Sequence, residues 1–404
     1  MYPAAETNGR RPRLHILILT DRDWTHPQGG GTGTNLYGQV SRWIAWGHRV
    51  SVIACSYPGA AACERIGALT LHRVGGRSTV FPRAILRQWR GLVPDADVVL
   101  EVVNGITFLT PLWLRTPRVT LVHHIHRDHY VREMGLPGRI AAFLLETLPL
   151  RLLYRRSRFL TISKASAVGI AAHGIPPEQI EVGYLGVEHE AYGADPSVRA
   201  TEPTLLYLGR LKRYKRIEVV LDVLERNPEA VLELAGEGDH RPALEAEIDR
   251  RGLSDRVRMH GHVSEETKRE LYQRAWLNIT ASSAEGWCLS VMEAAVCGTP
   301  SAALAVGGLP ESIVDGRTGI LARNTGELAE KVGAVLADEA LRDRLGGEAM
   351  RRAAEFTWDA TARHTLAVIE SQLRPALVPA APAPELTQTE VDARRQDEAA
   401  LPRR

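Results

Sequence analysis

Two glutamates in the C-terminal third of the chain have the residue type and spacing to bind a polar ligand. Glu285 and Glu293 have seven residues between them, and Glu285 directly precedes Gly286. Apolar residues recur at helical spacing from Leu289 and the pattern ends at Gly298, which predicts Glu285 on a loop and Glu293 inside the helix. The start of a helix attracts anions, and carboxylates accept hydrogen bonds from hydroxyls. The stretch therefore fits a sugar nucleotide; an ordinary amphipathic helix with two solvated glutamates is the alternative.

A pair of cations follows a predicted strand at residues 204–208. Arg210 and Lys215 come after Gly209 and before a helical pattern. An arginine fork and a lysine ammonium can together neutralise a diphosphate leaving group without a metal ion. A solvated basic loop is the alternative interpretation.

A glycine-rich segment follows the continuous apolar run at residues 14–20. Its glycines include Gly30, Gly31 and Gly33, and a helical pattern with Leu36 and Val40 comes next. This order of strand, glycine loop and helix predicts backbone amides that approach an anion. It lacks both the third glycine of a dinucleotide-binding fingerprint and the Gly-Lys-Ser/Thr of a P-loop.

Histidines gather after another apolar run, RVTLV, in a short span that contains His123, His124, His126 and His129. Such a cluster could bind a metal, but no Cys or Glu ligand spacing supports it. The other interpretation is a loop at the carboxyl end of a parallel strand, where sites in open α/β sheets form. Asp95 and Asp97 match an Asp-x-Asp metal-binding motif, but they lie at the start of a predicted buried strand. We therefore predict no metal and no other cofactor.

The elements that must position these residues alternate between strand and helix, which predicts parallel α/β sheets. Residues 159–167 are expected to form the last strand of a first domain, and a polar, proline-containing linker follows it. Residues 301–321 are expected to supply a strand, a glycine turn and a hairpin-like segment. The predicted divisions are a first domain at 13–195, a second at 203–355, a terminal helix at 356–373 and a disordered tail at 374–404.

Bulk composition excludes several classes of protein. The 404 residues carry a formal net charge of only +2, so we expect no binding of nucleic acid. Four cysteines without a CxxC pair, no signal peptide and no long apolar run predict a cytoplasmic chain. Basic, apolar segments at 81–93 and 139–160 are typical of helices that contact a membrane surface, here its inner face, or of helices packed on a sheet. Composition does not predict the oligomeric state.

The residues around the two glutamates resemble those of the retaining family-4 glycosyltransferases of the GT-B fold. The shared segments are EGW, a Glu-Ala-Ala run, CGTP and GGLPESIVDGRTGIL, around a Glu-x7-Glu pattern. The resemblance extends over residues 14–373 and is strongest over 204–322. Cys288 departs from it, because the family commonly has a Gly or a Phe-type residue there.

This resemblance implies two Rossmann-like domains that face each other across a donor and acceptor cleft. It implies retaining, metal-independent transfer of a hexose from a UDP- or GDP-sugar to a hydroxyl acceptor, either a lipid-linked or envelope glycan or a small natural product. Arg210 and Lys215 would hold the diphosphate, while Glu285 would bind the hexose and Glu293 the ribose. His123, or His124 one residue later, would orient the sugar.

The remaining implied site residues fall into two sets. The donor-binding set comprises Gly30, Gly31, Gly33, Gly209, Gly236, Val263, Gly286, Trp287, Cys288 and Leu289, and the acceptor-binding set comprises Asn104, His124 and Arg127. Two alternatives belong to other classes: a nucleotide-dependent oxidoreductase on an α/β scaffold, and an inactive partner that only binds a nucleotide sugar. The missing dinucleotide fingerprint argues against the first, and the complete set of charged residues argues against the second.

Overall fold

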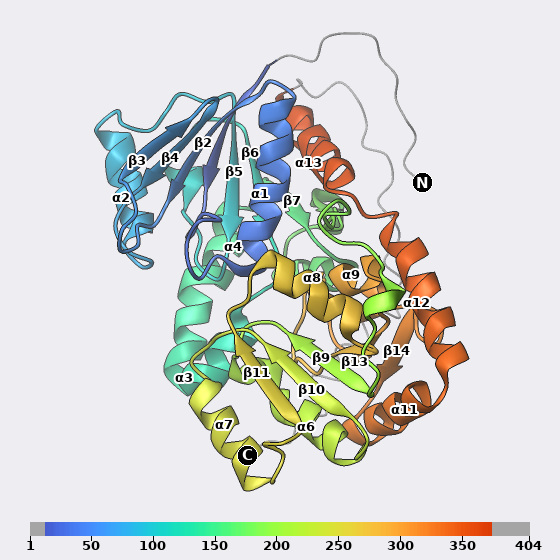
Figure 1. Ribbon diagram of the computed structural model, residues 1–404. Helices are drawn as coiled ribbons and strands as arrows, with labels where there is room; N and C mark the ends of the chain where they lie inside the picture. Colours follow the sequence, from blue (N-terminus) through green and yellow to red (C-terminus); the bar gives the residue numbers. More distant parts are fainter. Residues whose placement is uncertain (1–12, 374–404) are drawn as a thin grey trace.

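A computed structural model describes residues 13–373 of the chain; for residues 127–134 it describes the backbone alone. Within this range two sheets lie one above the other, each covered by helices on both faces (Figure 1). The strands are near-continuous apolar runs because both faces of each sheet are buried. The predicted α/β class with two Rossmann-like halves is confirmed.

The first sheet has eight strands in the order β3-β4-β2-β1-β5-β6-β7-β8. All neighbours are parallel except β3 and β4, which form an antiparallel edge. The strands are β1 His15–Leu19, β2 Arg49–Ala54, β3 Cys63–Ile66, β4 Leu69–Arg73, β5 Val98–Val103, β6 Arg118–Val122, β7 Arg158–Thr161 and β8 Ile180–Val182.

The second sheet has six parallel strands in the order β11-β10-β9-β12-β13-β14. Its order reverses between β9 and β12, and ligands of open α/β sheets bind beyond the carboxyl ends of the strands at such a point. The strands are β9 Thr204–Leu208, β10 Val231–Ala235, β11 Val257–Gly261, β12 Leu277–Thr280, β13 Ser301–Leu304 and β14 Gly319–Ala322.

Helices connect the parallel strands and cover both sheets. Those of the first half are α1 Gly30–Ala45, α2 Val80–Trp89, α3 Arg127–Ala142, the π-helical η2 Phe143–Thr147, α4 Leu148–Leu153 and α5 Lys164–Ala171, with the short 3-10 helices η1 Thr110–Leu112, η3 Pro177–Gln179 and η4 Pro196–Val198. Those of the second half are the 3-10 helix η5 Arg213–Lys215, then α6 Ile217–Glu225, α7 Arg241–Arg250, α8 Glu265–Arg274, α9 Leu289–Val296, α10 Leu309–Ser312, α11 Thr325–Ala337, α12 Glu339–Ala353 and α13 Trp358–Leu373.

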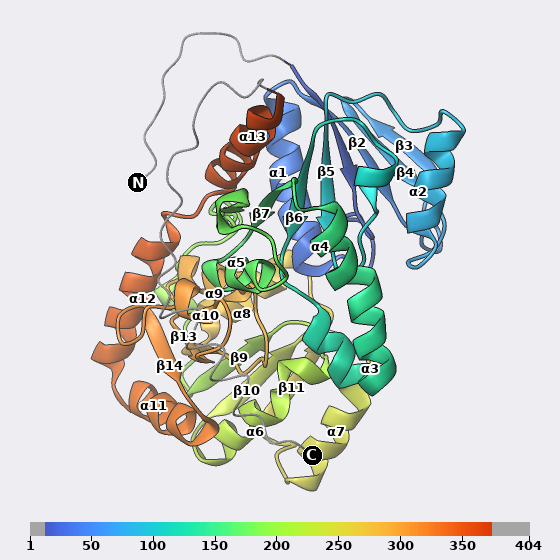
Figure 2. The same cartoon turned by 180° about the vertical axis from the view of Figure 1, so that it is seen from behind.

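The last helix, α13, returns from the second half and packs along α1 on the first sheet, as both views show (Figures 1 and 2). The contact is close at Gly38, where a Cβ atom would lie 2.4 Å from Cδ2 of Trp358. Trp43 is fully buried there and its indole N–H donates to the carbonyl oxygen of Ala362 at 3.0 Å. The end of the chain thus braces the helix that begins at the glycine-rich segment.

Three local predictions were wrong. The glycine-rich segment is not a loop throughout, because α1 already begins at Gly30. Residues 159–167 are not one strand: β7 ends at Thr161, α5 begins at Lys164, and β8 is the last strand of the sheet. The expected hairpin near residue 319 is instead a parallel strand, β14, reached from β13 through α10. The predicted tail at 374–404 lies outside the described residues.

Candidate active site

The helix α1 and the β9–α6 connection meet where the two sheets face each other. A Cβ atom on Gly30 would lie 3.7 Å from the guanidinium carbon of Arg210, and one on Gly31 would lie 3.9 Å from Cδ1 of Leu289. The N-terminus of α1 therefore faces a cation of the second half. A helix N-terminus beside an arginine favours a bound anion.

Lys215, in the same β9–α6 connection as Arg210, forms a buried ion pair with Glu285. The Lys215 Nζ lies 2.5 Å from Glu285 Oε1, and the two side chains are 15% and 11% exposed. Ser282 Oγ donates to the same carboxylate oxygen at 2.7 Å. Burial, the largest single influence, would lower the pKa of Lys215, but Glu285 together with Tyr214, Tyr207 and Cys288 raises it overall. Burial likewise opposes ionisation of Glu285, yet Lys215 holds its pKa below the ordinary value, so both groups are charged near neutral pH.

The loop that carries Glu285 is held by the glycine pair of the GGLP segment. The amide of Gly308 donates to the carbonyl oxygen of Glu285 at 2.8 Å. A Cβ atom on Gly307 would lie 2.3 Å from that same oxygen, and one on Gly308 would lie 1.9 Å from the carbonyl oxygen of Gly286. Only glycine permits this approach of two backbones. The segment that carried the resemblance thus supports the loop of one candidate carboxylate.

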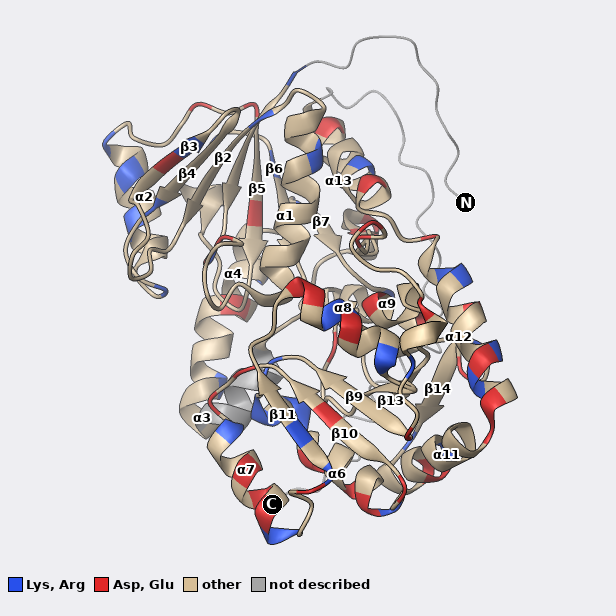
Figure 3. Cartoon of the chain, in the orientation of Figure 1, with Lys and Arg blue, Asp and Glu red and all other residues tan. Residues whose placement is uncertain are grey.

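Arg210 and the second glutamate are each oriented by a tyrosine. Arg210 Nη2 donates to the hydroxyl of Tyr214 at 3.0 Å. Glu293 is 8% exposed, and its two oxygens accept from Lys268 Nζ and from the hydroxyl of Tyr272, both at 2.9 Å. Sequence reasoning did not find Lys268 or Tyr272, although their spacing of four places them on one face of a predicted helix. Figure 3 shows the mixed charges of this helix, α8.

His123 directly follows β6 and lies next to the Glu285 loop. A Cβ atom on Gly286 would lie 3.1 Å from the carbonyl oxygen of His123. The imidazole is 4% exposed, and burial, assisted by the neighbouring His124, lowers the pKa of His123 to about 3. His123 is therefore neutral. Its Nε2 lies 2.8 Å from Nδ2 of Asn35 on α1, a partner that the sequence did not indicate.

The other predicted donor residues are placed in different ways. Gly209 and Gly236 lie at adjacent strand ends, where a Cβ atom on Gly236 would come within 1.9 Å of the carbonyl oxygen of Gly209. The side chain of Trp287 is 1% exposed and packs on other aromatic rings, so only its backbone is placed to meet a ligand. Cys288 precedes α9 with a φ of +71°, and burial raises the pKa of its thiol to about 12. Val263 is half-buried on the hydrophobic core of the second half.

One predicted acceptor residue, Asn104, lies beside the carboxyl end of β1. Asn104 Nδ2 donates to Asp21 Oδ1 at 2.7 Å, and Asp21 Oδ2 pairs with Arg22 at 2.9 Å. Asp21 and Arg22 follow β1 directly and were not predicted. His124 is exposed, and the centre of its ring lies 4.2 Å from that of His126 in a stacked arrangement. The side chain of Arg127 lies outside the described residues.

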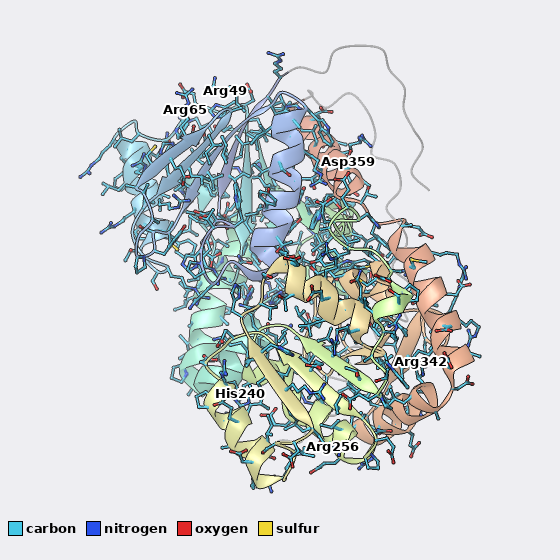
Figure 4. The ribbon with its side chains drawn as sticks, viewed as in Figure 1. Arg49, Arg65, His240, Arg256, Arg342 and Asp359 are labelled. Carbon is cyan, nitrogen blue, oxygen red and sulfur yellow. The ribbon has the colours of Figure 1, made fainter. Side chains whose placement is uncertain are left out.

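The Asp-x-Asp sequence lies at the opposite edge of the first sheet. Asp97 Oδ2 accepts from the amide of His15 at 2.7 Å, where β1 begins. This edge also carries Arg49, at the top of Figure 4 and far from the second sheet. Among the described side chains, those of residues 13–126 and 135–373, no group of three or more His, Cys, Asp or Glu residues is arranged to hold a metal ion.

Family comparisons agree with this geometry. The model of the Glycosyltransferase Family 4 matches residues 29–191, and that of the Glycosyl transferases group 1 matches residues 190–352. A D-inositol 3-phosphate glycosyltransferase of Kribbella flavida is 30% identical over 49% of this chain and 52% of its own length. In four such relatives the match spans between 42% and 55% of the relative, which is about half its length.

Solved structures share the fold at low sequence identity. A sucrose-phosphate synthase from Thermosynechococcus elongatus superposes with a TM-score of 0.77 at 19% identity, over 89% of this chain and 99% of that one. The Anabaena protein HepE, solved in complex with UDP-glucose, gives 0.70 at 18% identity, over 89% and 100%. The two family models together extend over nearly all of both sheets, and this chain belongs to the family-4 glycosyltransferases of the GT-B fold.

Proposed function

We propose that this chain is a retaining glycosyltransferase that moves a hexose from a nucleoside diphosphate sugar to a hydroxyl acceptor without a metal ion. The observation that carries the proposal is the meeting of the α1 N-terminus with Arg210 and the Lys215–Glu285 pair. A helix end and two fixed cations form a preorganised environment for a diphosphate, and such electrostatic stabilisation is usually the largest catalytic contribution. UDP is the first donor base to test, because HepE was solved with UDP-glucose.

The proposed reaction needs no protein base. The acceptor hydroxyl oxygen attacks the anomeric carbon on the face from which the diphosphate leaves, and the bond to the departing phosphate oxygen breaks. That oxygen takes the acceptor proton, while Arg210 and Lys215 stabilise its developing charge. Glu285 accepts hydrogen bonds from hexose hydroxyls and Glu293 from the ribose, each carboxylate already oriented by a cation.

A thermal unfolding series tests the donor class. The full chain is heated with UDP, GDP, ADP, dTDP or CDP, each with and without EDTA. A ligand that binds the folded state alone raises the midpoint by mass action. We expect one diphosphate to stabilise the protein equally in EDTA. A shift that EDTA abolishes would refute metal independence, and no shift with any diphosphate would refute the donor site.

A transfer assay tests the clamp and the stereochemistry. With the stabilising donor and a hydroxyl acceptor, the product should keep the anomeric configuration of the donor. Arg210→Ala should lower kcat by about 100-fold or more, the loss typical of a preorganised charge stabiliser, with little change in unfolding midpoint. Arg213→Ala, an exposed arginine of the same segment, is the matched control and should stay near wild type. An inverted product, or an Arg210→Ala enzyme as active as the control, would contradict the mechanism.

We further propose that an apolar helix face on α3, η2 and α4 contacts an anionic membrane surface. This face consists of the exposed side chains Leu136, Ile140, Phe143, Leu144 and Leu152. Exposed arginines, Arg139, Arg151 and Arg155, lie among them in the sequence, and their charge is complementary to anionic headgroups. Among residues 13–373 no helix is long and apolar enough to cross a membrane.

The helix α2, on the same flank in both views, has a similar composition (Figures 1 and 2). Its Trp89 is 77% exposed and its basic residues are visible in Figure 3. Co-sedimentation with vesicles of phosphatidylcholine, with or without phosphatidylglycerol, tests the proposal. We expect binding to the anionic vesicles that Leu144→Asp weakens and that Met350→Asp, at an exposed apolar residue of α12, leaves intact. A stable dimer that Leu144→Asp disrupts, without vesicle binding, would assign this face to a second copy instead.

A further inference from the structure

A buried chain of side chains connects the middle of α1 to the imidazole of His123. Gln39 Nε2 donates to Asn35 Oδ1 at 2.6 Å, and Asn35 Nδ2 lies 2.8 Å from His123 Nε2. The three side chains are at most 4% exposed. Gln39 and Asn35 are four residues apart on one helix, so they lie above one another on the same face.

This arrangement determines which ring nitrogen carries the proton. An amide nitrogen is a donor only, so Nε2 of His123 must accept the hydrogen bond from Asn35. Because His123 is neutral, its single N–H is then at Nδ1. That Nδ1 is buried and has no hydrogen-bond partner among the described residues. A buried donor without a partner is unfavourable, and an acceptor oxygen of a ligand would satisfy it.

The position of His123 indicates the kind of ligand oxygen that its ring would meet. Its backbone carbonyl abuts Gly286, which directly follows the carboxylate that we assign to the hexose, so the residue lies next to the proposed hexose position. A neutral donor at this place can bind a sugar oxygen without setting a full positive charge beside an electron-deficient anomeric carbon. An Nε2–H tautomer would instead turn the lone pair of Nδ1 toward the same oxygen.

We propose that Gln39 and Asn35 are positioning residues that hold His123 as its Nδ1–H tautomer, a preset hydrogen-bond donor to the transferred sugar. The proposal rests on the proposed glycosyltransferase function, because it names the role of a side chain in that same site. Neither amide touches the sugar; each acts through the next member of the chain. Asn35 fixes the ring directly, and Gln39 fixes the orientation of the Asn35 amide.

Nitrogen NMR of the histidine-labelled full chain tests the tautomer without any transfer assay. The chain has 14 histidines, and the His123 signals are assigned by their loss in His123→Gln. We expect long-range proton–nitrogen spectra to show a protonated Nδ1 and an unprotonated Nε2 for His123 in the wild type. A protonated Nε2 would overturn the proposal, because the side-chain amides of Asn35 and Gln39 would then have to be in the flipped orientation, with oxygen and nitrogen exchanged.

The variant Asn35→Asp tests the consequence for catalysis. A carboxylate at this position accepts only, so it should draw the proton to Nε2 and reverse the tautomer in the spectrum. We expect kcat to fall by about tenfold or more with a smaller change in KM, since a donor needed in the transition state is lost. Gln39→Met should lower kcat less and leave a mixture of tautomers. Asn278→Asp is the matched control, since Asn278 is equally buried but donates to Ser301 Oγ at 2.9 Å in the second half.

The outcomes separate this inference from the proposed function. If Asn35→Asp reverses the tautomer but its kcat equals that of Asn278→Asp, the positioning role is overturned. If Asn35→Asp leaves the tautomer unchanged, the hydrogen-bonded chain does not control the ring. If His123 is the Nδ1–H tautomer but the protein transfers no sugar from any donor, the proposed function is refuted, while the control of the tautomer by Asn35 and Gln39 is not.

Discussion

Replacement of Lys215 by methionine should strongly destabilise the protein, because it leaves the charge of Glu285 buried without a cation. The two groups are 2.5 Å apart and mostly buried. Removal of one member of a buried ion pair costs about 3–5 kcal/mol of folding free energy. The hydrogen bond from Ser282 to Glu285 remains in the variant, so we expect the lower end of this range, about 3 kcal/mol.

The size of this loss should depend on pH with a defined sign. In the wild type burial alone would raise the pKa of Glu285, but Lys215, assisted by Ser282 and His124, holds it below its ordinary value. A lowered pKa contributes stability that is present above the unfolded-state pKa and is lost as pH falls through the folded-state pKa. In Lys215→Met burial is opposed chiefly by the hydrogen bond from Ser282, so the pKa of Glu285 should rise and the folded state should take up a proton. The cost is then largest at about pH 8 and shrinks toward about pH 5.

Urea unfolding at these two pH values measures the effect. Lys212→Met is the control, because Lys212 pairs with Asp239 at 2.7 Å on an exposed surface, where a pair contributes about 0–1 kcal/mol. The double variant Lys215→Met/Glu285→Gln removes both charges and should recover much of the loss at pH 8. Equal losses of folding free energy in the two lysine variants would refute the account of this pair. A loss in Lys215→Met that does not change with pH would refute it as well.

Three smaller predictions concern the supports of the site. Cys288→Gly should raise the free energy of unfolding by about 1 kcal/mol, because it removes a side chain from a left-handed backbone, and a lower urea midpoint would contradict this. Gly308→Ala should weaken the diphosphate-dependent thermal shift, since its Cβ would collide with the neighbouring loop, whereas Gly347→Ala, which meets open space, should not. Tyr272→Phe should reduce UDP affinity by about fivefold in calorimetry through the lost hydrogen bond to Glu293; unchanged affinity would remove that hydrogen bond from the donor site.

The sequence predicted what depends on local pattern. The apolar run at 14–20 became β1, and the helical spacing from Leu289 became α9 with Glu293 inside it. The prediction for residues 319–322 was wrong, because a short apolar segment near a glycine turn fits a hairpin as well as a parallel strand. The difference is decided by β13, which β14 joins only after the α10 connection. Such pairing is a tertiary fact that no local window contains.

The partners of the site residues were hidden for a related reason. Asn35 and His123 are 88 positions apart, and Lys215 and Glu285 are 70 apart. Each residue alone fits a polar face or a solvated loop. The fold brings such residues together, because the carboxyl ends of parallel strands lie at one edge of a sheet. Their spacing in the sequence does not show this.

One face of α1 shows how this assembly is made. Gly31, Asn35, Gly38 and Arg42 recur at helical spacing, so they form a single stripe along the helix. Along it the stripe meets the start of α9, the end of β6 and the terminal helix, with Arg42 paired to Asp359 at 3.2 Å. Glycine at two of these four positions lets other elements approach the helix closely. Because the stripe belongs to one helix, α1 connects its packing against α13 with its own N-terminus and with the imidazole of His123, which directly follows β6. The terminal helix thus braces the helix whose N-terminus faces Arg210 and whose Asn35 contacts His123.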